Sequence, residues 1–307
     1  MDIIKRINAL KKEKNAVILA HNYQLPEVQD IADYIGDSLG LSRQAADTDA
    51  DVIVFCGVRF MAETAKILSP EKTVLIPDIK AGCPMADMIT AEQLREAKAR
   101  NPQAKVLCYV NTSAEVKAES DLCCTSANAI NMVQDVLVNN EEILFVPDKY
   151  LARYTAQCTG REFIFWHGYC PTHVKILAED ILRQKQLHPE AEVMVHPECN
   201  AEVCGLADAV LSTGGMSKYA RESAAREFIV GTENGMIYPL RKDNPGKKFY
   251  PASLRAICPN MKLTTLEKVL HALEYNEHEI TVPEHIRVPA KEAIEAMLNG
   301  GELVLSK

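Results

Sequence analysis

The chain has 307 residues, of which 47% are hydrophobic and 25% are charged, and its formal net charge is −8. This composition is typical of a globular protein with a buried core, and the acidic balance argues against nucleic acid or an anionic membrane as the main partner and favours small molecules. The polar N-terminus lacks an apolar signal core and no run approaches a membrane span, so we expect a cytoplasmic location.

Strand and helix patterns alternate along the chain. Short apolar runs of strand type occupy 17–20, 51–55, 73–77, 105–110, 142–146, 162–166, 192–196 and 228–231, with a weaker segment near Phe249. Helical spacing lies between these runs, for example after Pro26 and from Arg59. The order β-α-α-β-α-β recurs three times, which predicts parallel sheets with helices on both faces. Two further helices are predicted at 265–278 and 289–299.

Three segments of the chain resemble one another. They begin at Ala20, Cys108 and Val195 and read AHNYQLPEVQDIADYIGDS, CYVNTSAEVKAESDLCCTS and VHPECNAEVCGLADAVLST. Equivalent positions are 87 or 88 residues apart, which is the length of a small domain rather than of a solenoid unit. The aligned sets are His21, Tyr109 and His196; Glu27, Glu115 and Glu202; Asp33, Asp121 and Asp208; and Ser38, Ser126 and Thr213.

We therefore expect three α/β/α domains of three layers each, with parallel sheets, arranged by a pseudo-threefold axis around a central active site. The expected domains are 1–84, 85–171 and 172–259, and the C-terminal helices of 260–307 are expected to pack back on the first domain. Ligands of parallel sheets bind beyond the carboxyl ends of the strands. Residues that follow the strands should therefore meet at the centre.

Cys83, Cys170 and Cys258 follow the same period, and each precedes a proline. Cysteine is also a common buried residue, but three thiols that meet at one axis form a trigonal thiolate set for a soft metal or an iron–sulfur cluster. A Cys₃His zinc site is the alternative, with His173 of C-P-T-H as the fourth ligand. Because a Cys–His pair within one repeat does not need the threefold arrangement, we rank zinc below the cluster.

The residues after the first strand of each repeat differ in chemistry. They are His21, Asn22 and Tyr23; Tyr109, Val110 and Asn111; and His196, Pro197 and Glu198. Imidazole, phenol and carboxylate groups donate and accept protons, a set that suits dehydration or condensation, although a single His or Tyr at a strand end caps a backbone group equally well. We interpret Ser38, Ser126 and Thr213 as helix N-caps that point inward, where phosphate and carboxylate groups bind.

Several longer segments between Val17 and Lys262 carry a more specific signal. They are AHNYQLPEVQDIADYIGDSL, CGVRFMAETAKIL, GCPMADM, YVNTSAEVKAESD, CTSAN, GYCPTH, HPEC, STGGM and CPNMK. Together they resemble the signature segments of quinolinate synthase, the NadA family of bacterial and archaeal NAD biosynthesis. The resemblance implies three pseudo-symmetric α/β/α domains around an oxygen-sensitive [4Fe–4S] cluster. It also implies condensation of iminosuccinate (iminoaspartate) with dihydroxyacetone phosphate to give quinolinate, phosphate and water, with L-aspartate oxidase or aspartate dehydrogenase supplying the iminosuccinate.

The resemblance assigns roles to individual residues. The cluster ligands of the family fall on Cys83, Cys170 and Cys258, the three residues found by their period. Its substrate-binding positions fall on His21, Ser38, Tyr109, Asn111, Ser126, His196, Glu198 and Thr213. We expect the catalytic residues to be Glu198 as the base, Tyr109 and His21 as proton relays, and Tyr23 and His196 beside them.

Two departures from the family pattern and two other function classes bear on this interpretation. Some members carry C-x-x-C-x-x-C up to the third ligand, where this chain has Arg255, so a regulatory disulfide is not expected here. The segment PDKYLA from Pro147 stands where members often read PDxNLG.

A non-catalytic three-domain binding protein and an aconitase-like hydro-lyase are the alternative functions.

Six further cysteines are predicted to be buried apolar residues on strands or helices. They are Cys56, Cys108, Cys123, Cys124, Cys199 and Cys204. In the cytoplasm such thiols are reduced rather than paired as disulfides.

Overall fold

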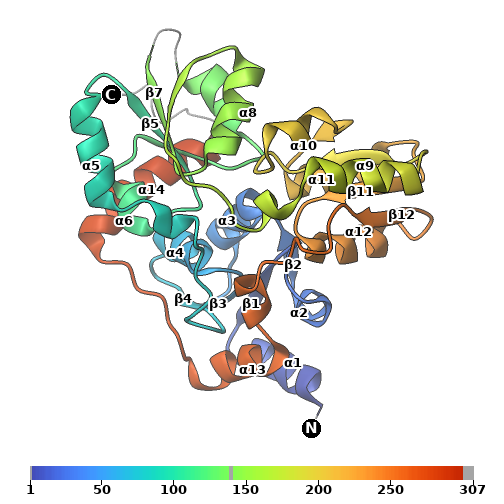
Figure 1. The fold of residues 1–307 in the computed structure, drawn as a ribbon. Helices are drawn as coiled ribbons and strands as arrows, with labels where there is room; N and C mark the ends of the chain where they lie inside the picture. The colour runs from blue at the N-terminus through green and yellow to red at the C-terminus, as the bar shows by residue number, and fades with distance from the viewer. Residues whose placement is uncertain (1, 138–140, 300–307) are drawn as a thin grey trace.

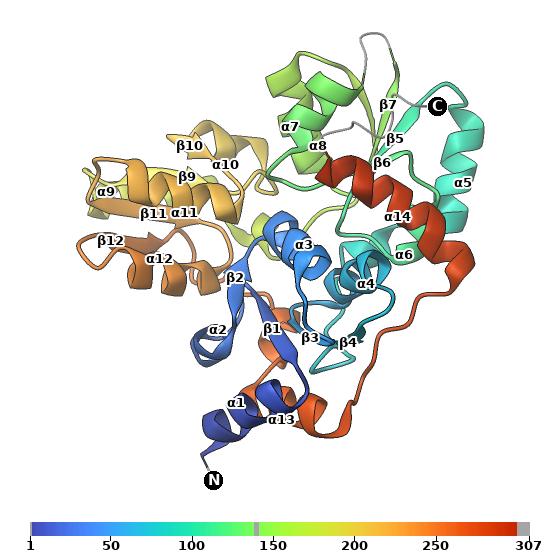
Figure 2. The ribbon, with the colours of Figure 1, turned by 180° about the vertical axis from the view of Figure 1, so that it is seen from behind.

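The computed structural model describes residues 2–137 and 141–299. Within these residues the strands form three parallel four-stranded sheets, ordered β2-β1-β3-β4, β6-β5-β7-β8 and β10-β9-β11-β12. Figures 1 and 2 show them as three lobes, each with its own helices, arranged around a common centre. The predicted α/β class with parallel sheets and flanking helices is confirmed.

The elements follow one another in the same order in each lobe. The first lobe contains α1 (Ile3–Glu13), β1 (Ala16–His21), α2 (Pro26–Ile31), β2 (Tyr34–Gly36), α3 (Ser38–Asp47), β3 (Val52–Cys56), α4 (Arg59–Leu68) and β4 (Thr73–Leu75). The second contains α5 (Ala91–Arg100), β5 (Lys105–Tyr109), α6 (Ala114–Ala118), β6 (Leu122–Cys124), α7 (Ala129–Asn131), β7 (Ile143–Val146), α8 (Lys149–Thr159) and β8 (Phe163–Phe165). The third contains α9 (Ala178–Leu187), β9 (Glu192–Val195), α10 (Ala201–Gly205), β10 (Ala209–Val210), α11 (Thr213–Glu222), β11 (Glu227–Gly231), α12 (Ile237–Asp243) and β12 (Lys248–Pro251).

The prediction of three strands per repeat is wrong, because each sheet has a fourth strand between the two helices that follow its first strand. These strands, β2, β6 and β10, have only three, three and two residues. A run this short shows no apolar period in the sequence. The central strands were recognisable because both sheet faces are covered, so that β3 and β7 are buried along their whole length.

One carboxylate has the same structural role in all three lobes. The aspartates of one aligned set directly precede the short edge strands β2, β6 and β10. They are Asp33, Asp121 and Asp208. Their Oδ2 atoms accept the backbone N–H of Ile18, Val106 and Val193, each at 2.8 Å. The edge strand is too short to pair with this part of the first strand, and the carboxylate satisfies the amide instead. The aligned aspartates are therefore structural.

The aligned glutamates lie in the first turns of α2, α6 and α10. Glu27, Glu115 and Glu202 are the acidic residues of these turns. A negative charge at this position is favourable because the helix dipole is positive at its N-terminus. Two of the four aligned sets thus stabilise the scaffold rather than form the site.

The two C-terminal helices pack on different lobes. α13 (Leu266–Tyr275) lies against α1 and β3 of the first lobe. α14 (Glu284–Leu298) lies mainly against α6 and β6 of the second lobe, and also touches α4 of the first (Figure 2). Its buried residues, which include Ala290 and Ile294, belong to the same core cluster as the interior of the second lobe. α14 thus fastens the first and second lobes together.

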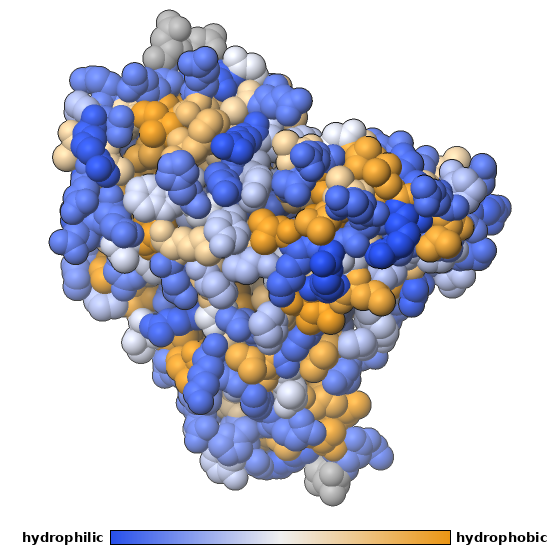
Figure 3. Space-filling view, viewed as in Figure 1, coloured by the Kyte–Doolittle hydropathy of each residue, from blue (hydrophilic) through white to orange (hydrophobic). Residues whose placement is uncertain are grey.

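The surface is mostly polar on the face seen in Figure 3, where hydrophilic residues are interspersed with several separate apolar patches. None of the helices in 2–137 and 141–299 is long and apolar enough to cross a membrane.

The substitution Ile294→Ala tests the packing of α14. Ile294 is fully buried, so removing its side chain should lower the free energy of unfolding by about 2–5 kcal/mol through lost burial and a residual cavity. Urea unfolding followed by circular dichroism measures the change. The control is Val288→Ala on the exposed side of the same helix, where the valine is 44% exposed and we expect a change within about 0.5 kcal/mol. Equal effects of the two substitutions would contradict the packing.

Candidate active site

All twelve residues predicted for the site line one cavity at the centre of the three lobes. They are His21, Tyr23, Ser38, Cys83, Tyr109, Asn111, Ser126, Cys170, His196, Glu198, Thr213 and Cys258. His21 and Tyr109 are the last residues of β1 and β5, and His196 directly follows β9. The cavity therefore lies at the carboxyl edges of the sheets, where parallel strands place their functional residues. The roles of these residues stay predictions.

Each of the three cysteines precedes a 3₁₀-helical turn. The turns are η1 (Ala86–Met88), η3 (His173–Lys175) and η5 (Asn260–Leu263). In every case the backbone amides two and three residues after the cysteine face its sulfur and lower its pKa. These are the amides of Met85 and Ala86, of Thr172 and His173, and of Asn260 and Met261. Amides that point at a sulfur favour its thiolate form, as they do around metal-bound cysteines.

The three thiols lie in a setting that a metal centre would suit. Burial raises the pKa of Cys83 to about 12 and raises the pKa values of Cys170 and Cys258, despite the opposing effect of the amides. A soft cationic centre would supply the positive charge that keeps such sulfurs ionised. Each sulfur follows the last strand of one sheet and faces two backbone amides. The three residues therefore fit a centre bound by thiolates.

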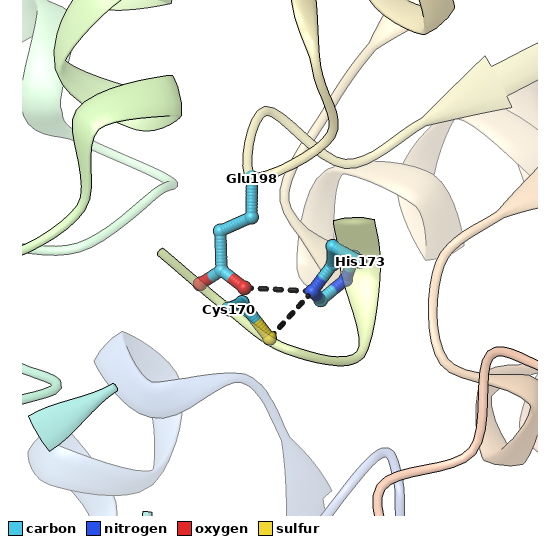
Figure 4. A group of neighbouring side chains, drawn as sticks. All are labelled: Cys170, His173 and Glu198. Carbon is cyan, nitrogen blue, oxygen red and sulfur yellow. Dashed lines mark hydrogen bonds and ion pairs between the residues drawn. The ribbon is translucent and has the colours of Figure 1, made fainter. Parts of the chain in front are cut away.

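One of these cysteines, Cys170, forms a tight group with His173 and Glu198 (Figure 4). Their potential ligand atoms lie within 4.8 Å of one another. His173 Nδ1 is 2.7 Å from Glu198 Oε2 and 3.1 Å from Cys170 Sγ. His173 Nε2 is 2.9 Å from the hydroxyl oxygen of Thr232. Both ring nitrogens thus have protein partners, and the geometry favours His173 as a residue that orients Glu198 over His173 as a zinc ligand.

A chain of hydrogen bonds runs through the cavity from Tyr109 to Tyr23. The Tyr109 hydroxyl donates to Glu198 Oε1 at 2.6 Å, and Glu198 contacts His173 as described. On the other side of His173, the Thr232 hydroxyl lies 2.6 Å from the Tyr23 hydroxyl. Burial raises the pKa of both tyrosines far above the ordinary value, so both phenols keep their protons as donors. Proton donors and acceptors from different lobes therefore form one connected network.

Glu198 is ionised within this network. Burial alone would raise its pKa, but the electrostatic interaction with His173 and the hydrogen bonds from His173 and Tyr109 outweigh burial and lower the pKa below the ordinary value. The side chain is almost completely buried. Glu198 is thus a carboxylate held by two donors and shielded from bulk water.

His21 and His196 are neutral and adopt the same tautomer. The Nδ1 atom of His21 accepts the backbone N–H of Tyr23, and that of His196 accepts the backbone N–H of Glu198, both at 3.2 Å. Burial, the largest cause, lowers the pKa of each imidazole to about 3. The remaining proton is therefore on Nε2, which in His196 lies 3.1 Å from the Ser126 hydroxyl. Both rings can donate a hydrogen bond without carrying charge.

The prediction that Ser38, Ser126 and Thr213 are N-caps is wrong. Asp37 and Ser212 are the N-caps of α3 and α11, because their side chains, one residue earlier, accept the amides of Gly40 and Gly215. Ser38 and Thr213 are then the first residues of these helices.

In the second lobe Asn128, not Ser126, is the N-cap of α7, and Ser126 lies in the turn before it. All three hydroxyl residues still line the cavity. Asn111 lies nearby with a buried Oδ1 that has no hydrogen-bond partner in the protein, so it is available to a ligand.

The remaining cysteines are free thiols outside the cavity lining. Five of the six predicted to be buried are buried: Cys56, Cys108, Cys123, Cys124 and Cys199. Cys199, however, lies in the turn after β9 rather than in a helix or strand, and Cys204 is only partly buried on α10, so these two predictions are wrong in part. Cys158 on α8, which the prediction omitted, is exposed.

Four cavity or network residues were missed as functional candidates. Thr232 and Glu233 follow β11, and a search of the carboxyl ends of all strands, not only the first of each repeat, would have found them. His173 had been considered only as a zinc ligand. Lys262 contacts Glu233 across 29 residues of sequence, and no local pattern indicates that pairing.

Comparison with known proteins identifies relatives along nearly the whole chain. The NadA family model, described as quinolinate synthetase A protein, matches residues 5–299. Quinolinate synthase of Dehalococcoides mccartyi strain CBDB1 is 57% identical over 296 residues, which is 96% of this chain and 97% of the relative. Quinolinate synthase 1 of Methanosarcina acetivorans is 56% identical over 297 residues, 97% of both chains. The chain thus belongs to the quinolinate synthase (NadA) family, as the sequence segments indicated.

Proposed function

We propose that this enzyme condenses iminosuccinate with dihydroxyacetone phosphate in the central cavity and releases phosphate and water. Synthesis of quinolinate for NAD biosynthesis is the activity of the family to which the chain belongs. The observation that carries the proposal is that three cysteine turns and a network of proton donors and acceptors converge on one cavity. A binding protein would not need a carboxylate and two phenols in one hydrogen-bonded chain.

We assign the sulfurs of Cys83, Cys170 and Cys258 to a [4Fe–4S] cluster. The support is the matching pair of amides at each sulfur and the position of all three in the cavity lining. A cluster held by three thiolates has one iron without a protein ligand, and this iron supplies Lewis-acid chemistry towards a substrate oxygen. The other functions of the site fall to the side chains of the protein.

The anionic groups of the substrates would bind at the N-termini of α3 and α11 and at the turn before α7. Ser38, Thr213 and Ser126 present hydroxyls there, and the first amides of a helix favour phosphate or carboxylate. The unpartnered Oδ1 of Asn111 would accept a hydrogen bond from substrate. Anchoring at several lobes would hold two substrates in one orientation, which lowers the entropic cost of condensation.

Glu198 is the base in this account. Its two donors, Tyr109 and His173, hold it in one position, and a proton taken from substrate can pass to the neighbouring groups of the network. His21 and His196 would donate from Nε2 to carbonyl or hydroxyl oxygens as negative charge develops on them. Tyr23 would act as a further donor at the far end of the network.

Three further expectations belong to the proposal. The lobes correspond to the domains 1–84, 85–171 and 172–259. L-aspartate oxidase or aspartate dehydrogenase supplies the iminosuccinate, because an imine of this kind hydrolyses in water and must be used soon after it forms. The protein works in the cytoplasm, where its free thiols stay reduced.

Replacing each cluster cysteine separately by serine tests the ligand set. Cys83→Ser, Cys170→Ser and Cys258→Ser should each lose the brown cluster, because a hydroxyl does not replace a thiolate as an iron ligand. Iron and acid-labile sulfide analysis of protein purified without oxygen measures the loss. Cys158→Ser, at an exposed cysteine on α8, is the control and should keep full iron content. Four irons per chain in all three ligand variants would reject the assignment.

The substitution Glu198→Gln tests the base. The amide keeps the shape of the side chain but cannot take a proton, so kcat for quinolinate formation should fall by about 10²–10⁴-fold. The exposed Glu202→Gln on α10 is the control and should leave kcat unchanged. Near-normal turnover of Glu198→Gln, with the cluster present, would show that another group is the base.

A further inference from the structure

A fully buried carboxylate lies directly behind the third cysteine. Glu233 has no exposed surface, and both of its oxygens are saturated. Oε1 accepts the backbone N–H of Cys258 at 3.1 Å and lies 3.0 Å from Lys262 Nζ. Oε2 accepts the backbone N–H of Gly235 at 2.7 Å and a hydrogen bond from Lys262 Nζ at 3.1 Å. The carboxylate thus fixes the backbone of Cys258 through a direct hydrogen bond.

Lys262 extends this contact to the first lobe. Its ammonium group also donates a hydrogen bond to the carbonyl oxygen of Tyr23, one of the predicted active-site residues. Lys262 lies four residues after Cys258, in the 3₁₀ turn η5 that surrounds the cysteine sulfur. The Glu233–Lys262 pair therefore connects three segments that are far apart in sequence: the end of β11, the Cys258 turn and the segment after β1.

Gly235 shows how closely these groups are packed. A Cβ atom at this position would lie 2.7 Å from Glu233 Oε2, 2.8 Å from Lys262 Nζ and 2.8 Å from the Tyr23 carbonyl oxygen. Real Cβ contacts of this length essentially do not occur, so a larger residue would push the pair apart. Gly235 has no positive φ angle, so its backbone conformation does not require a glycine. The close approach of Glu233, Lys262 and the Tyr23 carbonyl does.

The second lobe has a related arrangement. Asp148 is fully buried at the start of α8, at the position that corresponds to Glu233 after the third strand. Its Oδ1 accepts the amides of Tyr150 and Leu151, and the carboxyl group also faces the backbone N–H of Cys170. The Oδ2 atom of Asp148 is buried without a hydrogen-bond partner. Among the described residues, the carboxyl group at this position therefore hydrogen-bonds to the backbone of the cysteine and to a lysine only in the third lobe.

We propose that Glu233, paired with Lys262, is a positioning residue that holds Cys258 in register as a ligand of the metal centre and couples this ligand to the Tyr23 side of the cavity. The inference rests on the proposed cluster and deepens it. Outer partners that fix the position of a metal ligand affect affinity and electronic properties as well as geometry. Loss of the carboxylate should therefore change the behaviour of the cluster even where the fold is intact.

The test compares Glu233→Gln and Gly235→Ala with the wild type, all purified and assayed without oxygen. The glutamine replaces one carboxylate oxygen, which accepts hydrogen bonds, by an NH₂ group, which donates them. The alanine pushes Glu233 and Lys262 apart without changing any charge. Glu227→Gln is the matched control, because Glu227 pairs with Lys248 at 2.8 Å on the surface of the same lobe. Circular dichroism and thermal unfolding establish that each variant is folded. The readouts are iron loss to EDTA, the electron paramagnetic resonance spectrum of the reduced cluster and its midpoint potential.

We expect both variants to lose iron about 10- to 100-fold faster than the wild type, the range typical of outer partners of metal ligands. Their spectra and potentials should shift, while Glu227→Gln behaves as the wild type. A folded Glu233→Gln or Gly235→Ala protein with wild-type iron loss, spectrum and potential would overturn the inference and leave the proposed function intact. Wild-type protein without iron and sulfide would instead overturn the proposed cluster, and the inference with it.

Discussion

The parallel direction of the strands is the constraint on which the site depends. In each sheet every strand ends at the same edge, so the segments that follow the strands emerge together. Three such edges face one centre, and residues as distant in sequence as His21 and Cys258 line one cavity. A cavity formed between three sheets is enclosed by protein on several sides, which explains how Glu198, His21 and His196 come to be buried together.

The scaffold repeats, whereas the chemistry varies. Asp33, Asp121 and Asp208 make the same backbone contact in every lobe, and the three cysteines receive the same pairs of amides. The residues at the carboxyl ends of the first strands, by contrast, carry an imidazole, a phenol and a second imidazole. Symmetric placement thus brings three similar sulfurs to one cavity, and the asymmetric side chains place different proton donors and acceptors around them.

Much of this arrangement could be predicted from the sequence because it repeats. The period of 87 or 88 residues located the cysteines and the strand ends, and the parallel sheets followed from the alternation of elements. The strands β2, β6 and β10 escaped prediction because two or three residues show no periodicity. The N-caps of α3 and α11 were misplaced by one residue because Asp37 and Ser38, like Ser212 and Thr213, are both suitable cap residues. The packing of α14 and the Glu233–Lys262 pair depend on tertiary contacts that leave no local pattern.

The central claim is that the three thiols hold an iron–sulfur cluster that takes part in the reaction. The most direct test is iron and acid-labile sulfide analysis, with an absorption spectrum, of wild-type protein purified without oxygen. The account predicts about four irons and four sulfides per chain with a broad absorption band at about 400 nm. One zinc per chain without labile sulfide would contradict it and would make Cys83, Cys170 and Cys258 ligands of a different metal.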